Sequence, residues 1–342
     1  MDQEKLAQLL CKIPNGVFNL LYAGRRIRKD GQVLNAKTQL LCKVAAKQTP
    51  PVAEETVENA RAQLENLSAA FGGEHIPLPY VQELTIPGPA RPIPARLYKP
   101  RDTDEKLPVL VGFHGGGYIR GSVDSHDGMF RRLAKFGDFA VLSVDYRLAP
   151  EHKFPAAVDD AYAALRWVQE NGASKGLDPE RVAVGGDSSG GNLATVACLD
   201  AKRNGTPQPV MQLLIYPTTN ANFEAPSHTL FSEGFFLTEE RMNWYRDCYM
   251  NNPSERDDPR ASPLLAEDVS GLAPALILTA GFDPLRDEAE EYAASLKDAG
   301  GPVGNIRYEG MVHGFMSLSG LLPEADKALN TAAQSLKSAF SE

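Results

Sequence analysis

A short stretch of the chain, VAVGGDSSGGN at residues 182–192, places two adjacent serines among four glycines. It lies between an apolar strand-like run, RVAV, and a helix-like run, NLATVACLDAKR. A dinucleotide-binding loop would require G-x-G-x-x-G, and a Walker loop would require Gly-Lys-Ser/Thr; neither pattern is present. Two interpretations remain: a plain glycine-rich turn, and the G-x-S-x-G turn that raises a nucleophilic serine above a sheet.

The flanking glycines distinguish the two serines. Ser188 has Gly186 two positions before it and Gly190 two positions after it. This spacing relieves the crowding of the backbone in a strained strand-to-helix turn. Ser189 has an aspartate at the first of these positions instead of a glycine. We therefore predict that Ser188 is the nucleophile, with Ser189 as the second choice.

A serine nucleophile needs a base, and in this kind of turn the order along the chain is serine, acid, histidine. Four of the six histidines precede Ser188, and His228 falls in a strandless segment before any candidate acid on a later strand. His313 is left, in the run GMVHGF just after the last strand-like segment. We predict that His313 is the base and that a loop carries it to the C-terminal edge of the sheet.

The acid that orients the histidine is expected at the end of the preceding strand. The run ALILTAGFDPLRDE offers Asp283 just after the strand and Asp287 about one helical turn further, where its side chain would point elsewhere. An Asp before a Pro is also a common helix cap. One carboxylate can cap a helix and also orient a histidine, so the cap interpretation does not exclude a catalytic role. Because Ser188 and His313 are both in place, we predict that Asp283 is the acid.

Three consecutive glycines follow another strand-like run, in the sequence FHGGGY. Glycines let backbone N–H groups converge on one point without obstruction by side chains, and in acyl transfer that point is the developing oxyanion. The predicted donors are the N–H groups of Gly116 and Gly117, with that of Ser189 as the third. A flexible loop is the alternative, and His114 is expected to anchor the loop rather than to act as a base.

These groups require a scaffold of alternating strands and helices, and the chain from residue 76 onward has this pattern. Short apolar runs alternate with helical stretches such as AVDDAYAALRWVQEN, which is typical of a mostly parallel sheet covered on both faces. Before the parallel part, VQELTI and ARLYKP look like a pair of strands. The strand-like runs are LPVLVGF, FAVLSVDY, RVAVGG, MQLLIYP, ALILTAG and NIRYEG.

Two segments depart from this alternation. Residues 1–75 carry apolar residues at helical spacing and contain no convincing strand. Residues 218–268 form an insertion without a clear strand, which includes the aromatic-rich run GFFLTEERMNWYRDCYM. We predict that residues 76–342 form the catalytic domain and that the N-terminal segment and the insertion form a helical cap over the strand ends.

The motifs HGGG, VDYRLAPEHKFPAAVDD, GDSSGGN, DPLRDE and HGF occur in this order along the chain. Together they resemble those of the bacterial hormone-sensitive-lipase-like esterases, often called family IV, of the α/β-hydrolase superfamily. The resemblance covers about residues 75–342. It departs at Ser189, where the family usually has alanine, which donates the same backbone N–H. It implies an eight-stranded sheet, a helical cap and hydrolysis of carboxylic esters without a cofactor, and many members form homodimers.

The composition restricts the partners and the location. The 342 residues carry a net charge of −9 without a basic stripe, which argues against a nucleic acid or an anionic membrane surface as partner. The N-terminal residues do not resemble a secretory signal, and no run approaches the roughly 18 apolar residues of a spanning helix. Free thiols, no metal site and a cytoplasmic location are expected, because the cysteines are far apart and lack metal-ligand spacing: Cys11, Cys42, Cys198 and Cys248.

The predicted function is that of a serine carboxylesterase acting on short- to medium-chain esters, a small-molecule substrate, through an acyl-enzyme intermediate. A lipase or an amidase could use the same three side chains. A non-catalytic small-molecule receptor on this scaffold would be expected to have lost one of them, and the sequence contains all three.

Overall fold

The computed structural model describes residues 13–48 and 50–342. Cys11 and the first twelve residues of the N-terminal segment that is predicted to be helical therefore lie outside the described residues. The three other cysteines, Cys42, Cys198 and Cys248, are free thiols, as expected.

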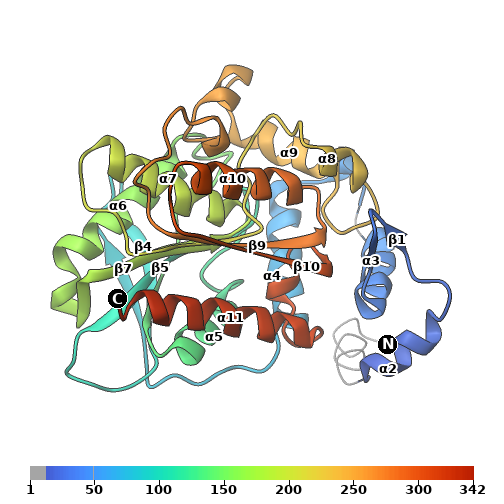
Figure 1. Cartoon of the computed structure of the whole chain (residues 1–342), viewed down its shortest axis with the longest axis horizontal. Helices are drawn as coiled ribbons and strands as arrows, with labels where there is room; N and C mark the ends of the chain where they lie inside the picture. Colours follow the sequence, from blue (N-terminus) through green and yellow to red (C-terminus); the bar gives the residue numbers. More distant parts are fainter. Residues whose placement is uncertain (1–12, 49) are drawn as a thin grey trace.

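An eight-stranded sheet with the order β10-β9-β8-β7-β5-β6-β4-β3 forms the centre of the molecule (Figure 1). Strand β3 runs antiparallel to β4 and β4 antiparallel to β6, whereas all other neighbours are parallel. The predicted α/β class and the mostly parallel eight-stranded sheet are confirmed. The strands are β3 (Tyr80–Ile86), β4 (Ile93–Lys99), β5 (Leu107–Phe113), β6 (Ala140–Val144), β7 (Leu177–Asp187), β8 (Gln212–Ile215), β9 (Ala275–Phe282) and β10 (Val303–Val312).

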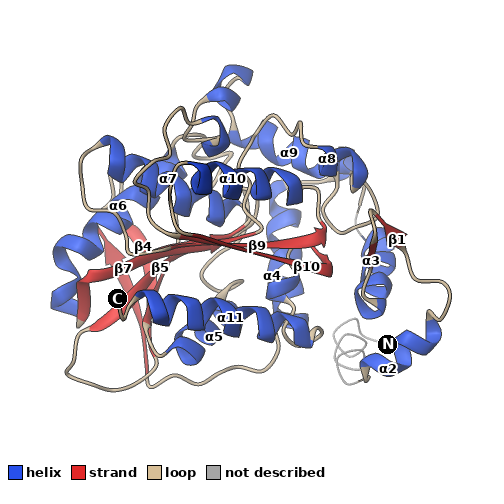
Figure 2. Ribbon diagram, viewed as in Figure 1, coloured by secondary structure: helices blue, strands red, loops and turns tan. Residues whose placement is uncertain are grey.

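Helices cover both faces of this sheet (Figure 2). Helices α5 (Asp127–Gly137) and α11 (Pro323–Ala339) enclose one apolar core against it. The other core lies under α6 (Ala156–Asn171), α7 (Ser189–Arg203) and α10 (Arg286–Asp298). Because both faces are covered, every residue of β6 and β9 is buried, which explains the continuous apolar runs in the sequence.

The N-terminal segment is mainly helical, as predicted, but it also contains two short strands that the sequence analysis missed. Strands β1 (Arg28–Lys29) and β2 (Gln32–Val33) pair antiparallel across Asp30 and Gly31, which both have positive φ angles, 52° and 72°. An Asp-Gly pair favours such a tight hairpin turn, but strands of two residues are too short to produce an alternating pattern. The helices here are α2 (Asn15–Leu21), α3 (Ala36–Gln48), η1 (Val52–Glu54) and α4 (Val57–Phe71).

The insertion at residues 218–268 contains no strand, in agreement with the prediction. Its principal helix, α9, begins after Thr238, whose side chain accepts a hydrogen bond from the backbone N–H of Arg241. In Figure 1 the helices α8 and α9 and the N-terminal helix α3 lie at the end of the molecule where β10 terminates. The elements are α8 (Pro226–Leu230), α9 (Glu239–Tyr249), η3 (Pro253–Asp257) and η4 (Pro263–Leu265).

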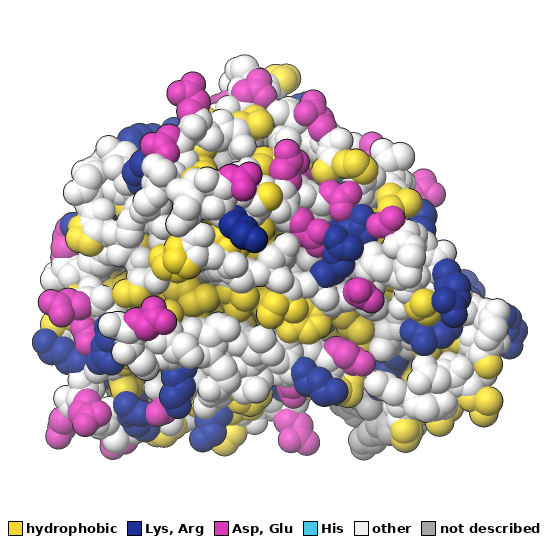
Figure 3. Space-filling model, in the orientation of Figure 1, with side chains coloured by type: hydrophobic (Ala, Val, Ile, Leu, Met, Phe, Trp, Pro, Cys, Tyr) yellow, Lys and Arg dark blue, Asp and Glu magenta, His cyan; other side chains and the backbone are white. Residues whose placement is uncertain are grey.

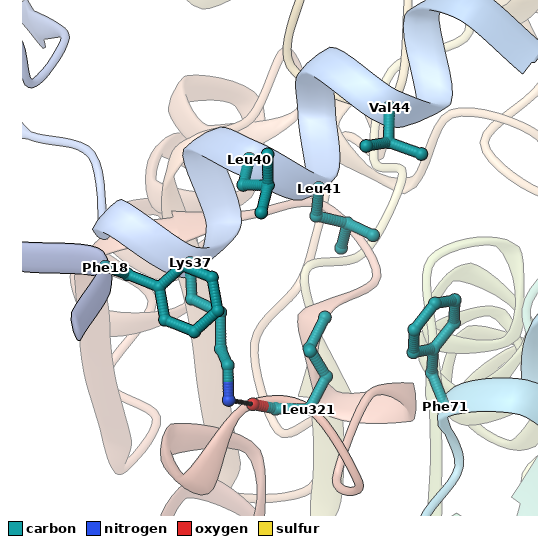
Figure 4. Close-up of a pocket in the computed structure, with 7 residues that line it drawn as sticks. All are labelled: Phe18, Lys37, Leu40, Leu41, Val44, Phe71 and Leu321. Atoms are coloured by element: carbon teal, nitrogen blue, oxygen red, sulfur yellow. Dashed lines mark hydrogen bonds between the residues drawn. The ribbon is translucent and has the colours of Figure 1, made fainter. Parts of the chain in front are cut away.

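Helix α3 is attached to the body of the protein around a small cavity of about 30 Å³ (Figure 4). The ammonium group of Lys37 crosses this space and donates a hydrogen bond to the backbone oxygen of Leu321 at 2.9 Å. The remaining wall is apolar, so burial of side chains and this charged hydrogen bond both contribute to holding the helix in place. The lining residues are Phe18, Lys37, Leu40, Leu41, Val44, Phe71 and Leu321.

The face shown in Figure 3 mixes basic and acidic side chains, with an apolar band between the two helical layers. In the part of the chain that the structure describes, no helix combines the length and the apolar character needed to cross a membrane.

Candidate active site

Ser188 stands at the turn between β7 and α7, with φ and ψ angles of 56° and −119°. A non-glycine residue rarely adopts a positive φ, so the surrounding structure must hold this conformation. The neighbouring glycines explain how it does so. A Cβ atom on Gly186 would come within 2.2 Å of the backbone oxygen of Phe113, and one on Gly190 within 2.0 Å of the same atom. Only glycine permits the turn to pack this closely against β5.

Asp283 and His313 follow the neighbouring parallel strands β9 and β10, so both reach the same edge of the sheet. His313 Nδ1 lies 2.8 Å from Oδ2 of Asp283, and His313 Nε2 lies 3.0 Å from Oγ of Ser188. With the proton on Nδ1, the imidazole donates to the carboxylate and leaves Nε2 to accept from the serine hydroxyl. The structure thus joins the three predicted side chains in one continuous chain of hydrogen bonds.

The acid and the histidine that the sequence analysis rejected, Asp287 and His228, contact other residues. Asp287 accepts a hydrogen bond from Nε of Arg286 at 2.7 Å. His228 is buried, and its Nε2 is 2.6 Å from Glu288. Asp283 also accepts, through its other oxygen, the N–H of Leu285 at 2.9 Å, a bond to the residue two positions later that is typical of a turn closed by an aspartate. Leu285, and not Asp283, is the N-cap residue of α10, so the alternative interpretation of Asp283 as a helix cap is wrong.

The glycine loop after β5 lies beside the serine. Gly116 and Gly117 have φ angles of 132° and 64°, which side-chain-bearing residues rarely adopt. Among the described residues, the N–H groups of these two glycines and of Ser189 donate to no acceptor. A Cβ atom on Gly117 would come within 2.7 Å of the ring of Tyr245, so the loop also has no room for side chains.

Beneath the loop lies a buried aspartate that the sequence analysis did not assign. Oδ1 of Asp187 accepts the N–H of Gly115 at 2.8 Å and lies 3.3 Å from Nε2 of His126. Burial by itself would raise the pKa of Asp187, but the charge and hydrogen bonds of His126 and the N–H of Gly115 outweigh it and lower this pKa. The position of Asp187 directly before Ser188 is the sequence feature that could have indicated a role for it in the site. Its carboxylate ties the loop to the serine turn.

His114 anchors the same loop, in line with the expectation that it is structural. Its Nδ1–H donates to the backbone oxygen of Gly115 at 2.9 Å, and its ring stacks on Tyr146, with 4.3 Å between centroids. The hydroxyl of Tyr146 donates to the backbone oxygen of His114 at 2.7 Å. Burial, and next the charge of His126, lower the pKa of His114 to about 3, so this ring is neutral at neutral pH.

A cavity of about 700 Å³ opens above Ser188 and His313. Its wall combines the glycine loop with side chains from α3, α4 and the insertion, among them Leu67, Phe236 and Met242. The N-terminal segment and the insertion are joined by the guanidinium of Arg241, which is 2.7 Å from the carboxylate of Glu55. Within the described ranges no cluster of three or more metal-ligating side chains occurs. The site can therefore enclose an ester beside a serine that is hydrogen-bonded to a histidine.

Fold and site together define a serine hydrolase of the α/β-hydrolase type. A family model described as an alpha/beta hydrolase fold matches residues 110–317, more than half of the chain, and the chain belongs to this family. Its relatives include the carboxylic ester hydrolase LipN of Mycobacterium tuberculosis, 44% identical over 315 residues that cover 90% of this chain and 83% of the relative.

Other relatives agree. The ethyl acetate hydrolase of Pseudomonas putida is 39% identical over 82% of this chain and 89% of its own length. The crystal structure of a hyperthermophilic esterase from the archaeon Pyrobaculum calidifontis superimposes with a TM-score of 0.85 at 42% identity, covering 89% of this chain and 98% of the esterase. The expectation of a carboxylic ester hydrolase of the hormone-sensitive-lipase-like group is confirmed: the protein is an esterase.

Proposed function

We propose that Ser188, His313 and Asp283 are the catalytic triad of this esterase and that the N–H groups of Gly116, Gly117 and Ser189 form its oxyanion hole. The observation that carries this assignment is the continuous hydrogen-bonded chain from the serine hydroxyl through the imidazole to the buried carboxylate. The orientation matches the chemistry, because the base must reach the hydroxyl proton while the acid holds its other nitrogen.

The reaction proceeds in two halves. In the first, Nε2 of His313 takes the hydroxyl proton while Oγ of Ser188 attacks the ester carbonyl, and the N–H groups of the oxyanion hole stabilise the negative oxygen. The histidine then returns the proton to the departing alcohol, which leaves an acyl-serine. In the second half, water gives its proton to the histidine and attacks the acyl carbon. Collapse of this intermediate releases the carboxylic acid and returns the proton to the serine.

We infer that residues 1–75 and the insertion at 218–268 act as a cap that limits the size of the acyl group. The cavity volume of about 700 Å³ lies in the range of small-molecule sites, and its roof is largely apolar. This supports esters of roughly butyrate to octanoate length. The relative named for ethyl acetate hydrolysis also points to small esters.

A series of p-nitrophenyl esters from acetate to palmitate tests this function. The expected result is a maximum of kcat/KM between butyrate and octanoate, with little activity on emulsified long-chain triglyceride. Strong triglyceride hydrolysis would instead identify a lipase, and hydrolysis of the matching anilides at comparable rates would identify an amidase.

Deletion of residues 1 to about 45 tests the cap. The truncated protein is expected to lose solubility and activity, because apolar surface in the wall of the cavity becomes exposed while the triad is untouched. A soluble truncation with full activity and unchanged chain-length preference would exclude a cap role for this segment. A homodimer and a cytoplasmic location stay predictions, the first of which light scattering on the purified protein can decide.

A further inference from the structure

The wall beside the proposed oxyanion hole carries an arginine that the mechanism does not use. Arg120 follows the glycine loop, and its backbone N–H donates to the oxygen of Gly116 at 3.3 Å. A Cβ atom on Gly116 would lie 3.1 Å from Cγ of Arg120, so the arginine side chain starts directly against the loop. Its guanidinium lies over the ring of Tyr245, 5.0 Å from the centroid, and both residues line the cavity above Ser188.

The charge of Arg120 has no protein counterpart. In the described part of the chain its guanidinium forms no ion pair and no hydrogen bond, and its Nε is buried without an acceptor. The stacked tyrosine attracts the cation but does not neutralise it. An uncompensated cation in a partly enclosed site is unfavourable, and interactions with an anion are stronger there than in bulk water.

The other charged side chains in the cavity wall already have partners. Arg241 pairs with Glu55 at 2.7 Å. Nε of Arg246 makes no hydrogen bond, but it lies 3.6 Å from the carboxylate of Asp247, which Arg246 shares with Arg256. Among the described residues that line the cavity, Asp187 is the single carboxylate, and it accepts a hydrogen bond from the N–H of Gly115 in the glycine loop. Among the described residues of the wall, Arg120 is therefore the arginine that has no carboxylate within ion-pair distance, and it lies beside the reacting groups.

We propose that Arg120 determines substrate specificity by binding a carboxylate carried by the ester, so that anionic esters are preferred to neutral ones of the same shape. A planar guanidinium is well suited to the two oxygens of a carboxylate. The net charge of −9 opposes an anionic substrate at long range, but salt screens such fields beyond about 8 Å. The guanidinium inside the cavity therefore has the larger effect on the binding of a substrate anion. This proposal rests on the proposed esterase function of the same site.

The test compares each anionic ester with its neutral amide counterpart. Ethyl hydrogen adipate and ethyl adipamate place the carboxylate or the amide in the acyl part, and 5-acetoxypentanoate and 5-acetoxypentanamide place it in the alcohol part. The measured quantity is the ratio of kcat/KM for the anionic ester to that for the amide. The proteins are the wild type, Arg120→Gln, Arg120→Lys and, as a matched loss of one charge, Arg166→Gln. Arg166 belongs to a surface pair with Glu170 on α6.

The wild type is expected to show a ratio above one in at least one of the two pairs. This ratio should fall about 10- to 100-fold in Arg120→Gln, the effect of losing a hydrogen bond to a charged group. Arg120→Lys should retain part of it, because the charge stays, and Arg166→Gln should equal the wild type. The pair that responds shows whether the carboxylate belongs to the acid or to the alcohol.

A wild-type ratio at or below one in both pairs, or the same ratio in Arg120→Gln, would overturn the proposal. If Arg120→Gln does not fold, the salt dependence of the wild-type ratio tests the proposal instead. A ratio that falls with added salt supports charge recognition, and a ratio that stays constant excludes it. Failure of the wild type to hydrolyse p-nitrophenyl butyrate would refute the esterase function itself. Hydrolysis of butyrate without a charge preference would refute only the role of Arg120.

Discussion

The catalytic edge of the sheet and the proposed cap face each other across the cavity, and they are held in different ways. At the catalytic edge, strand ends and buried hydrogen bonds position each polar group: Asp283 and His114 are both fully buried. On the cap side the wall is mostly apolar, and the polar links between its two segments include the pair of Arg241 and Glu55 and a hydrogen bond from Arg241 to the backbone oxygen of Pro50. The contrast supports the proposal that the sheet provides the chemistry and that the proposed cap selects the substrates.

Among the substitutions at the catalytic edge, replacement of Ser188 should cause the largest loss of activity. Ser188→Ala removes the nucleophile and should lower kcat by on the order of 10⁶-fold without unfolding the protein. Hydrolysis of p-nitrophenyl butyrate and labelling by an organophosphate measure the effect. Ser189→Ala is the matched control and should keep much of the activity, because alanine still supplies the backbone N–H. The reverse ranking would transfer the nucleophile to Ser189.

Replacement of the acid should have the next largest effect. Asp283→Asn keeps the shape of the side chain but no longer holds the imidazole as a proton acceptor for the serine, so kcat should fall on the order of 10⁴-fold. Asp287→Asn, in the first turn of α10, should change kcat far less, since Asp287 contacts Arg286 and not His313. Equal losses in the two variants would contradict the assignment of Asp283.

A substitution in the cap should affect stability and selection more than chemistry. Glu55→Gln leaves the guanidinium of Arg241 buried without its anion, since the two side chains are 0% and 8% exposed. Breaking a buried pair in this way costs about 3 kcal/mol of unfolding free energy, and the preference for butyrate over palmitate should weaken. Urea denaturation and the ester series measure both effects.

The exposed pair of Arg61 and Glu151 provides the control for this prediction, with side chains 34% and 54% exposed. Glu151→Gln should lower the unfolding free energy by less than about 1 kcal/mol. If the two variants are equally stable and equally selective, the buried pair does not hold the cap.

Acidification should lower the stability of the folded protein through His114, which lies at the catalytic edge and not in the proposed cap. The pKa of this buried imidazole is about 3, below its ordinary value of 6.5, so below pH 6.5 the unfolded chain binds the proton more readily than the folded protein. Stability from this group is complete above pH 6.5 and is lost as the pH falls toward 3. Between about pH 7.5 and about pH 5 the loss should be about 2 kcal/mol.

Urea denaturation at the two pH values measures this loss. His114→Asn should reduce the difference between them, whereas the variant of an exposed histidine, His75→Gln, should keep it. If both variants match the wild type, His114 does not carry the acid sensitivity.

The sequence alone was sufficient for the fold class and for the candidates of the triad. Strands buried on both faces appear as unbroken apolar runs, such as the one ending at Phe282, and the G-x-S-x-G spacing is a local pattern. Chain order then left His313 and Asp283 as partners of Ser188. The hairpin of β1 and β2 was missed, because two-residue strands have no periodicity to detect.

Contacts between distant parts of the chain were beyond sequence patterns. Gly115 and Asp187 are separated by 72 positions, and Glu55 and Arg241 by 186. From the local sequence, each of these residues looks like an ordinary surface charge or loop residue. Its role depends on which group the fold brings into contact with it. The same holds for Arg120, whose lack of a partner can be seen only when every neighbour has been placed.

The sequence by itself therefore determined what is encoded locally: the alternation of strands and helices, the glycine-flanked serine turn and the order of the candidate nucleophile, acid and base. The tertiary structure decided how strand ends align, how large the cavity is and which charges are compensated. The physical reason is that backbone conformation and amphipathic patterning depend on neighbours in the chain, whereas burial and charge pairing depend on neighbours in space.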